Sequence, residues 1–397
     1  SISITRNYTY YFLLLPVALF ISTLLVHYLA PEAKGHGTER VIEAIHKRFG
    51  KINPAVVPIK LVATIVTIAM GGSAGKEGPC AQIGAGLSSI VASLLKFGDR
   101  DRRKLVICGI SAGFATVFGT PIAGAMFGLE VLFVGGVLYD VLLPSFIAGI
   151  VGYQVTAHLG ITYFHEPLHF VPVFSSFFFI KVCFGGIFFG LCSFLFIEIL
   201  RYVEGLSTKI NIWHPLKGVI GGIPLVIMAL IFSTQYLGLG LETIKNVLEG
   251  SHVSKGAFLL KMLFTSITLS FGGSGGIVTP IFFIGATSGN AFANIFGLDS
   301  TIFSAIGMVS LLAGAANTPI AASIMAIELF GASVAPFAAT SCVISFLMTG
   351  HRSVYPSQIL AVAKSPSIKI QRFKELDTSE DITIKPRPKS IIGFLTK

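Results

Sequence analysis

Long apolar runs alternate with short polar connections along most of this chain. The runs cover residues 10–28, 61–70, 174–196, 219–232 and 303–316. A helix of roughly 20 apolar residues is long enough to cross the hydrocarbon core of a bilayer, and several of these runs reach that length. The pattern therefore predicts an all-α polytopic membrane protein.

Glycine and proline interrupt many of the apolar segments, so several helices are expected to be too short or too broken to cross a membrane simply. The expected elements are full spans at 8–30, 138–159, 175–207 and 214–234, a short amphipathic helix at 37–50, an apolar segment at 56–72, a helix restarting from Pro79 over 79–96, a segment at 109–133 and a polar loop at 160–172. The 109–133 segment is expected to break at Gly119–Thr120–Pro121, because proline suits the first turn of a new helix.

The composition agrees with a membrane location. Of the 397 residues, 53% are hydrophobic and only 12% are charged, whereas a soluble domain is typically about 25% charged. The net charge of +10 gathers in a basic loop expected at 96–104 and in the tail at 358–397, and the positive-inside rule places both in the cytoplasm. We expect no soluble domain that could present these charges to a nucleic acid.

The five cysteines lie in apolar segments without metal-ligand spacing. They are expected to be buried free thiols, and no metal or other cofactor is predicted.

Two Gly-rich segments repeat each other about two hundred residues apart. Residues 71–86 read GGSAGKEGPCAQIGAG and residues 272–287 read GGSGGIVTPIFFIGAT, with eight of sixteen positions identical. A second pair, TPIAGAMFGLE at 120–130 and TPIAASIMAIE at 318–328, follows in the same order. Two halves with breaks at corresponding places indicate an internal structural repeat, whose relative orientation the sequence leaves open.

The repeat divides the chain into a first membrane half at 1–172, a second membrane half at 173–357 and a short basic tail at 358–397 without a regulatory domain.

The breaks themselves suggest a site for an anion. A broken helix leaves N–H groups unpaired at its N-terminus, and the helix dipole adds a partial positive charge there. Several such ends meeting inside a membrane would bind an anion without the tight grip of a full cationic side chain, which suits conduction.

Glu77 lies inside the first break, just before Pro79. An ionisable side chain inside a membrane break is a functional candidate. Its carboxylate would compete with an anion for the same N–H groups and would leave them when protonated, which predicts a gate and a possible proton carrier. The alternative is a carboxylate in an aqueous loop.

Two other classes of protein fit less well. A cation-coupled symporter would usually need acids at the breaks of both halves, but the break at 275–280 has none. A membrane enzyme would need a paired catalytic constellation, such as His-Glu-x-x-His or Gly-x-Ser-x-Gly with a base. We predict that neither motif is present, so no enzymatic activity is expected.

Four motifs over about residues 10–360 resemble those of the CLC family of chloride channels and chloride/proton antiporters. They are Ala30–Gly37 (APEAKGHG), Gly75–Pro79 (GKEGP), Gly276–Pro280 (GIVTP) and Gly350–Tyr355 (GHRSVY). The resemblance implies the family's array of tilted and broken helices in inverted repeats, and a homodimer with one pore per subunit. The family and the simple tail together predict a location in the plasma membrane. The resemblance also implies that one or two helices precede Ser1.

The resemblance assigns roles to residues of these motifs. Glu77 would be the external gate, and the anion-binding residues would be His36, Gly78, Ile277, Val278 and Tyr355. The remaining pore-motif residues would be Gly35, Gly37, Gly75, Lys76, Pro79, Gly276, Thr279 and Pro280.

Three positions depart from the family pattern. His36 replaces the central serine, which predicts altered selectivity or pH sensitivity unless its ring points elsewhere. Val278 replaces a phenylalanine, which predicts a wider or looser pore. Val131 replaces the internal proton-transferring glutamate of the antiporters and follows Glu130, which is expected, like Glu328, to be structural.

These departures favour chloride transport that is channel-like or weakly proton-coupled. A proton-coupled antiporter of chloride or fluoride remains the alternative.

Overall fold

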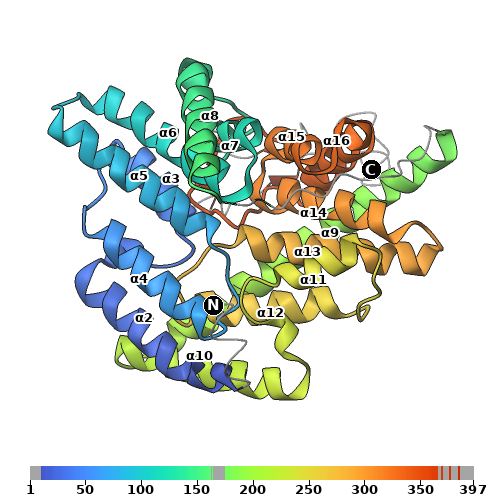
Figure 1. Cartoon of the computed structure of the whole chain (residues 1–397), viewed down its shortest axis with the longest axis horizontal. Helices are drawn as coiled ribbons and strands as arrows, with labels where there is room; N and C mark the ends of the chain where they lie inside the picture. The colour runs from blue at the N-terminus through green and yellow to red at the C-terminus, as the bar shows by residue number, and fades with distance from the viewer. Residues whose placement is uncertain are drawn as a thin grey trace.

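The computed structural model describes residues 10–161, 163, 175–364, 368–369, 375–376 and 383–384. Helices of very different length and tilt make up almost all of this part of the chain (Figure 1). The first half contains η1 (Tyr11–Leu14), α2 (Leu15–Leu29), η2 (Pro31–Ala33), α3 (Thr38–Arg48), α4 (Val56–Ala69), α5 (Glu77–Leu94), α6 (Asp99–Phe118), α7 (Pro121–Glu130), β1 (Phe133–Val134), η3 (Tyr139–Val141) and α8 (Leu142–His158).

The second half contains α9 (Ser176–Lys209), α10 (His214–Ile231), η4 (Thr234–Tyr236), α11 (Leu241–Leu248), α12 (Ala257–Ser270), α13 (Val278–Phe296), α14 (Ser300–Ala316), α15 (Pro319–Phe330), η5 (Ala332–Val334) and α16 (Ala335–Met348). The tail adds β2 (Ile359–Leu360), β3 (Ile368–Lys369) and β4 (Thr383–Ile384). Helices of the two halves pack together, with α2 beside α10 and α7 beside α15 (Figure 1).

The predicted spans are confirmed. Within the described residues, four helices are long and apolar enough to cross a membrane, at Tyr11–Leu29, Tyr139–His158, Ser176–Lys209 and His214–Ile231. The amphipathic helix is α3, and the predicted break is the left-handed Gly119 followed by Pro121 at the start of α7. Most of the loop expected at 160–172 lies outside the described residues.

Two boundaries were wrong. The basic segment expected to be a loop at 96–104 is mostly helical, because α6 begins at Asp99 after the extended Gly98. Asp99 and Asp101 stabilise that N-terminus, and Arg102 pairs with Asp99 at 2.7 Å. The restart of the helix expected at Pro79 occurs at Glu77, so Pro79 lies within the first turn of α5.

The cysteines are free, as expected, but not all are buried. Cys108, Cys192 and Cys342 are buried, whereas Cys80 and Cys183 are partly exposed.

Reciprocal hydrogen bonds relate the two halves. Gly75 N donates to Gly276 O at 2.8 Å, and Gly276 N donates to Gly75 O at 2.6 Å. The same exchange recurs nearby, where Ser73 N donates to Thr268 Oγ1 at 3.1 Å and Ser274 N donates to Thr67 Oγ1 at 3.0 Å. Equivalent residues that exchange equivalent bonds are the mark of a two-fold relation. The sequence repeat is therefore also a repeat in space.

Glycine allows the helices that follow each break to pack closely. A Cβ at Gly84 of α5 would lie 2.4 Å from Gly109 O of α6, and one at Gly285 of α13 would lie 2.5 Å from Gly307 O of α14. Small residues at such crossings let backbones of membrane helices approach one another. This packing fixes the position of the N-termini of α5 and α13.

Two buried lysines occupy equivalent positions in the two halves. Lys60 of α4 donates to Ala33 O at 3.0 Å and to Gly35 O at 2.6 Å. Lys261 of α12 donates to Tyr236 O at 3.0 Å and to Gly238 O at 2.9 Å. Lys60 thus holds the turn before α3, and Lys261 holds the turn before α11. The two lysines are separated along the chain by the same number of residues as the two Gly-rich segments. The sequence predictions did not include this correspondence.

Candidate functional site

Four segments distant in the sequence meet at one point. A Cβ at Gly78 would lie 2.0 Å from His36 O and 3.1 Å from Gly276 Cα. The His36 ring lies 5.4 Å from the Tyr355 ring, centroid to centroid. The structure therefore brings together the four motifs recognised in the sequence.

The Glu77 side chain reaches from the first residue of α5 to the N-terminus of α13. Its carboxylate is 1% exposed and accepts bonds from Thr279 N at 2.9 Å and from Thr279 Oγ1 at 2.6 Å. The alternative of a carboxylate in an aqueous loop is wrong. The negative charge lies at the positive end of a helix, where an anion would also be stabilised.

Backbone encloses this carboxylate tightly. A Cβ at Gly75 would lie 2.1 Å from Glu77 Oε1, and a Cβ at Gly276 would lie 2.3 Å from the same atom. Any side chain at either position would collide with the carboxylate. The two glycines are required at these positions by close approach to Glu77.

His36 and Tyr355 each bring a polar atom without a partner. Tyr355 is fully buried, and its Oη makes no hydrogen bond of normal geometry within the described residues, although Thr38 lies nearby. His36 is partly exposed, but its Nδ1 is buried and likewise unpartnered in this part of the chain. Buried polar groups normally have partners, so this pair marks a place for a ligand.

The other predicted residues differ in how they relate to the site. Ile277 caps α13 and Val278 begins it, so the first N–H groups of that helix have no intrahelical partner. Lys76 caps α5 but is exposed, and its side chain is not part of the buried site. Gly35 is fastened by Lys60, which orients the loop that carries His36.

Val131 is fully buried and ends α7. Its carbonyl accepts a bond of 2.8 Å from Gln358 Nε2, and its side chain offers no group that could carry a proton.

Glu130 and Glu328 are structural, as expected. Each caps the helix to which the other belongs, with bonds of 2.8–3.1 Å: Glu328 accepts from Ile122 N and Ala123 N, and Glu130 accepts from Ile320 N and Ala321 N. This exchange closes α7 and α15 on each other. The sequence predicted the capping but not that the caps are exchanged.

Serines in both breaks are structural too. The segments 71–75 and 272–276 formally spell Gly-x-Ser-x-Gly, but Ser73 Oγ lies 3.0 Å from Thr265 Oγ1 and Ser274 Oγ lies 3.1 Å from Thr64 Oγ1. Neither hydroxyl has a base as its partner in the described residues.

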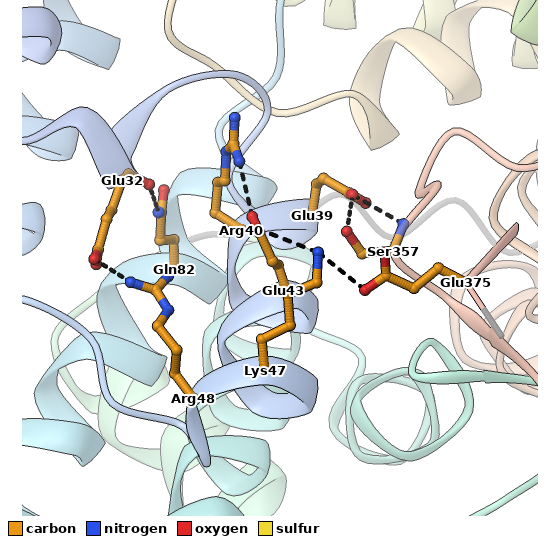
Figure 2. A network of polar contacts seen from close by, with 9 residues as sticks. All are labelled: Glu32, Glu39, Arg40, Glu43, Lys47, Arg48, Gln82, Ser357 and Glu375. Carbon is orange, nitrogen blue, oxygen red and sulfur yellow. Dashed lines mark hydrogen bonds and ion pairs between the residues drawn. The ribbon is translucent and has the colours of Figure 1, made fainter. Parts of the chain in front are cut away.

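A cavity of about 340 Å³ reaches the loop that carries His36. Polar side chains of α3, α9 and the tail line it, among them Glu39, Glu43, Lys47, Arg201 and Glu375. Figure 2 shows the α3 part of this lining, where Lys47 lies 3.7 Å from Glu43 and 3.1 Å from Glu375. Glu39 was not singled out from the sequence, because only the fold brings it to the cavity.

Residues 18–350 match the family model described as voltage gated chloride channel, and the chain therefore belongs to the CLC family. It is 36% identical over 358 residues to a chloride/fluoride channel protein of Pseudomonas syringae pv. tomato, covering 88% of this chain and 79% of that protein. It is 31% identical to an uncharacterized protein of Methanocaldococcus jannaschii, covering 86% of each.

Solved structures show the same fold. The crystal structure of a CLC-type fluoride/proton antiporter is similar with a TM-score of 0.83 and 29% identity, over 88% of each chain. That of a slow cyanobacterial Cl⁻/H⁺ antiporter is similar with a TM-score of 0.73 and 23% identity, over 85% of this chain and 83% of the other. The predicted family and the all-α CLC fold are confirmed. The chain is an integral membrane protein for CLC-type anion transport.

Proposed function

We propose that this protein exchanges a small halide, chloride or fluoride, for protons across a membrane, with Glu77 as both gate and proton carrier. The observation that carries the proposal is the position of the Glu77 carboxylate, which is buried and held by Thr279 N and Thr279 Oγ1 at the N-terminus of α13. An anion can use this helix end only after the carboxylate leaves it.

Protonation supplies the release. A neutral carboxyl group loses its charge attraction to the helix end, so a halide competes successfully for the freed amide. When Glu77 is protonated, a halide occupies the helix end; when Glu77 loses its proton, the carboxylate returns and displaces the halide. This alternation links proton movement to anion movement.

The central anion position lies where unpaired donors converge. His36 and Tyr355 present the two unpartnered polar atoms, and Ile277, Val278 and Gly78 belong to the adjoining helix starts. Backbone N–H groups and neutral side chains would hold a halide loosely enough to release it. The similar proteins named as a chloride/fluoride channel protein and a fluoride/proton antiporter support a halide as the substrate.

Channel-like conduction is the second candidate. Val131 favours it, because a buried valine at the position of the family's internal glutamate offers no proton site. In that case anions would cross without obligatory proton movement.

We further propose a homodimer with one pore per subunit in the plasma membrane, on the family resemblance.

The first prediction tests the gate. In liposomes loaded with chloride or with fluoride, the wild-type protein should take up protons against their gradient as the anion leaves. Glu77→Gln should keep anion flux and lose both proton uptake and pH dependence, because glutamine mimics the protonated acid. Simultaneous anion-electrode and pH recordings measure this.

Asp101→Asn, at the surface end of α6, is the matched control and should behave as wild type. Anion efflux without proton uptake by the wild-type protein would establish channel-like conduction instead. A Glu77→Gln variant that remains strongly pH-gated would assign the pH response to another group.

A further inference from the structure

Glu39 is a carboxylate with one satisfied and one unsatisfied oxygen. Its Oε1 accepts two bonds from Ser357, from N at 2.9 Å and from Oγ. Its Oε2 is buried and has no hydrogen-bond partner among the described residues. An ionised oxygen without a partner is costly to bury, whereas a protonated carboxyl group can carry its hydrogen there.

Glu43, another acid of the cavity, is held differently. Glu43 lies one turn further along α3 and pairs with Arg40 at 2.8 Å and with Lys47 at 3.7 Å. Glu39 makes no ion pair within the part of the chain that the structure describes. Figure 2 shows the Glu39 carboxylate directed at Ser357, apart from the ion pairs around Glu43 and Lys47.

Glu39 lines the same cavity as His36 and lies close to Tyr355. Both Glu39 and His36 line the cavity, on the same short stretch of chain. Ser357, which holds Glu39, follows Tyr355 by two residues, and Tyr355 Oη and His36 Nδ1 are the unpartnered atoms of the anion site. Glu39 therefore borders the cavity and is joined through Ser357 to the segment that carries Tyr355.

The segment after Tyr355 also bonds to Val131, the residue at the position of the family's internal glutamate. Ser357 bonds to Glu39, and the next residue, Gln358, bonds to the carbonyl of Val131. The short segment Ser357–Gln358 thus connects the Glu39 carboxylate to the backbone of Val131, whose side chain cannot carry a proton.

We propose that Glu39 is the inner proton acceptor of this transporter and relays protons between the cavity and Glu77. The relay rests on the proposed halide/proton exchange. In the step toward the anion site, the Oε2–H bond breaks and the proton passes to water at the His36–Tyr355 pair and then to the Glu77 carboxylate. The electron pair stays on Glu39, which takes its next proton from water in the cavity.

The charges around Glu39 are mixed. The groups that face it or share its cavity are Lys34, His36, Arg40, Glu43, Lys47, Arg201, Glu204, His214, Lys217, Tyr355 and Glu375, with Glu77 beyond Tyr355. Helix α3 does not span the membrane. Burial raises the pKa of Glu39 to about 7, although the bonds from Ser357 and the charge of Arg40 act in the opposite direction. A group with such a pKa both gains and loses protons near neutral pH.

The test separates Glu39 from Glu77 and from the fold. In the liposome assay, Glu39→Gln should lower proton uptake per halide by about tenfold or more while halide efflux stays within about threefold of wild type. Glu43→Gln, on the same helix and in the same cavity, should leave the ratio unchanged. Glu39→Asp should recover part of the proton uptake, because a shorter carboxylic acid can still relay.

Ser357→Ala provides a second readout that does not remove the acid. It deletes one bond that favours the ionised form, so the pKa of Glu39 rises further and the pH midpoint of proton uptake should move upward. An unchanged midpoint together with wild-type coupling in Glu39→Gln would overturn the relay.

The outcomes distinguish the two proposals. If wild type and Glu39→Gln exchange protons equally while Glu77→Gln does not, the relay is wrong and the exchange stands. If the wild-type protein moves no protons, both the exchange and the relay are wrong.

Discussion

Glu77 and Thr279 show at the residue scale how the duplicated breaks became unequal. In the aligned repeats, Glu77 corresponds to Val278 and Gly78 corresponds to Thr279. The first half thus contributes the acid, and the second half contributes both of its hydrogen-bond donors. A symmetric pair of acids would repel each other at this distance, whereas an acid facing a donor makes a bond that a proton can break.

A prediction at the same scale concerns the anion site. Tyr355→Phe removes one donor and should weaken chloride binding by about tenfold or more, because a hydrogen bond to a charged group contributes about 1.5–3 kcal/mol. Titration calorimetry of the purified protein measures this. Affinity equal to that of the wild-type protein would place the anion away from Tyr355 Oη.

His36 is tested by selectivity. His36→Ser restores the donor that most family members have and should change the ratio of fluoride to chloride flux several-fold, because an imidazole N–H and a hydroxyl reach an anion differently. Efflux measured for each halide gives this ratio. An unchanged ratio would mean that the ring does not contact the anion.

At the element scale, short helices are held in place by side chains from elsewhere in the chain. Glu130 and Glu328 exchange caps between α7 and α15, and Lys60 of α4 and Lys261 of α12 hold the turns that precede α3 and α11. Helix ends inside a membrane find no water, so protein groups must satisfy them. The two glutamates accept bonds from backbone N–H groups of α7 and α15, and the two lysines donate bonds to backbone carbonyls of the turns. These bonds help to fix the positions of the neighbouring helices.

Lys60 and Lys261 make a matched pair for an experiment. Lys60→Met and Lys261→Met each leave two buried carbonyls without a donor and should destabilise the protein by about 1–3 kcal/mol, seen as a lower midpoint of thermal unfolding in detergent. Only Lys60→Met should also weaken halide binding, because Lys60 alone holds the Gly35 loop next to His36. Equal loss of binding in both variants would mean that the effect is general instability.

At the scale of the whole molecule, the reciprocal bonds between Gly75 and Gly276 place the site on the boundary between the halves. Each half supplies one side of the anion path, so neither half contains a complete site. The tail joins the first half as well, because β2 pairs in parallel with β1, with Phe133 opposite Ile359 and Val134 opposite Leu360. Because β2 begins directly after Gln358, this pairing helps to fix the position of the stretch from Tyr355 to Gln358.

Assembly gives the prediction at this scale. By the family resemblance, light scattering in detergent should give a protein mass of two 42.2 kDa chains, each with its own pore. Mixed dimers of wild type and Glu77→Gln should then show two independent transport components. A single averaged component would indicate that the subunits share a path.

The sequence by itself determined the membrane class, the four long spans, the breaks and the motifs of the family. Each of these depends on residues close together in the chain, where hydrophobic runs, glycine and proline act locally. The candidate site residues Glu77, His36 and Tyr355 were predicted in the same way, because each lies within a short motif.

Only the tertiary structure decided the partners of these residues. Glu77 bonds to Thr279, Glu39 bonds to Ser357, and Glu130 caps a helix of the other half. A hydrogen bond between groups hundreds of residues apart depends on how whole helices pack, and local pattern carries no record of it. For the same reason the sequence showed that Val131 offers no proton site, whereas only the fold showed that Glu39 of α3 bonds to the segment that also reaches the Val131 carbonyl.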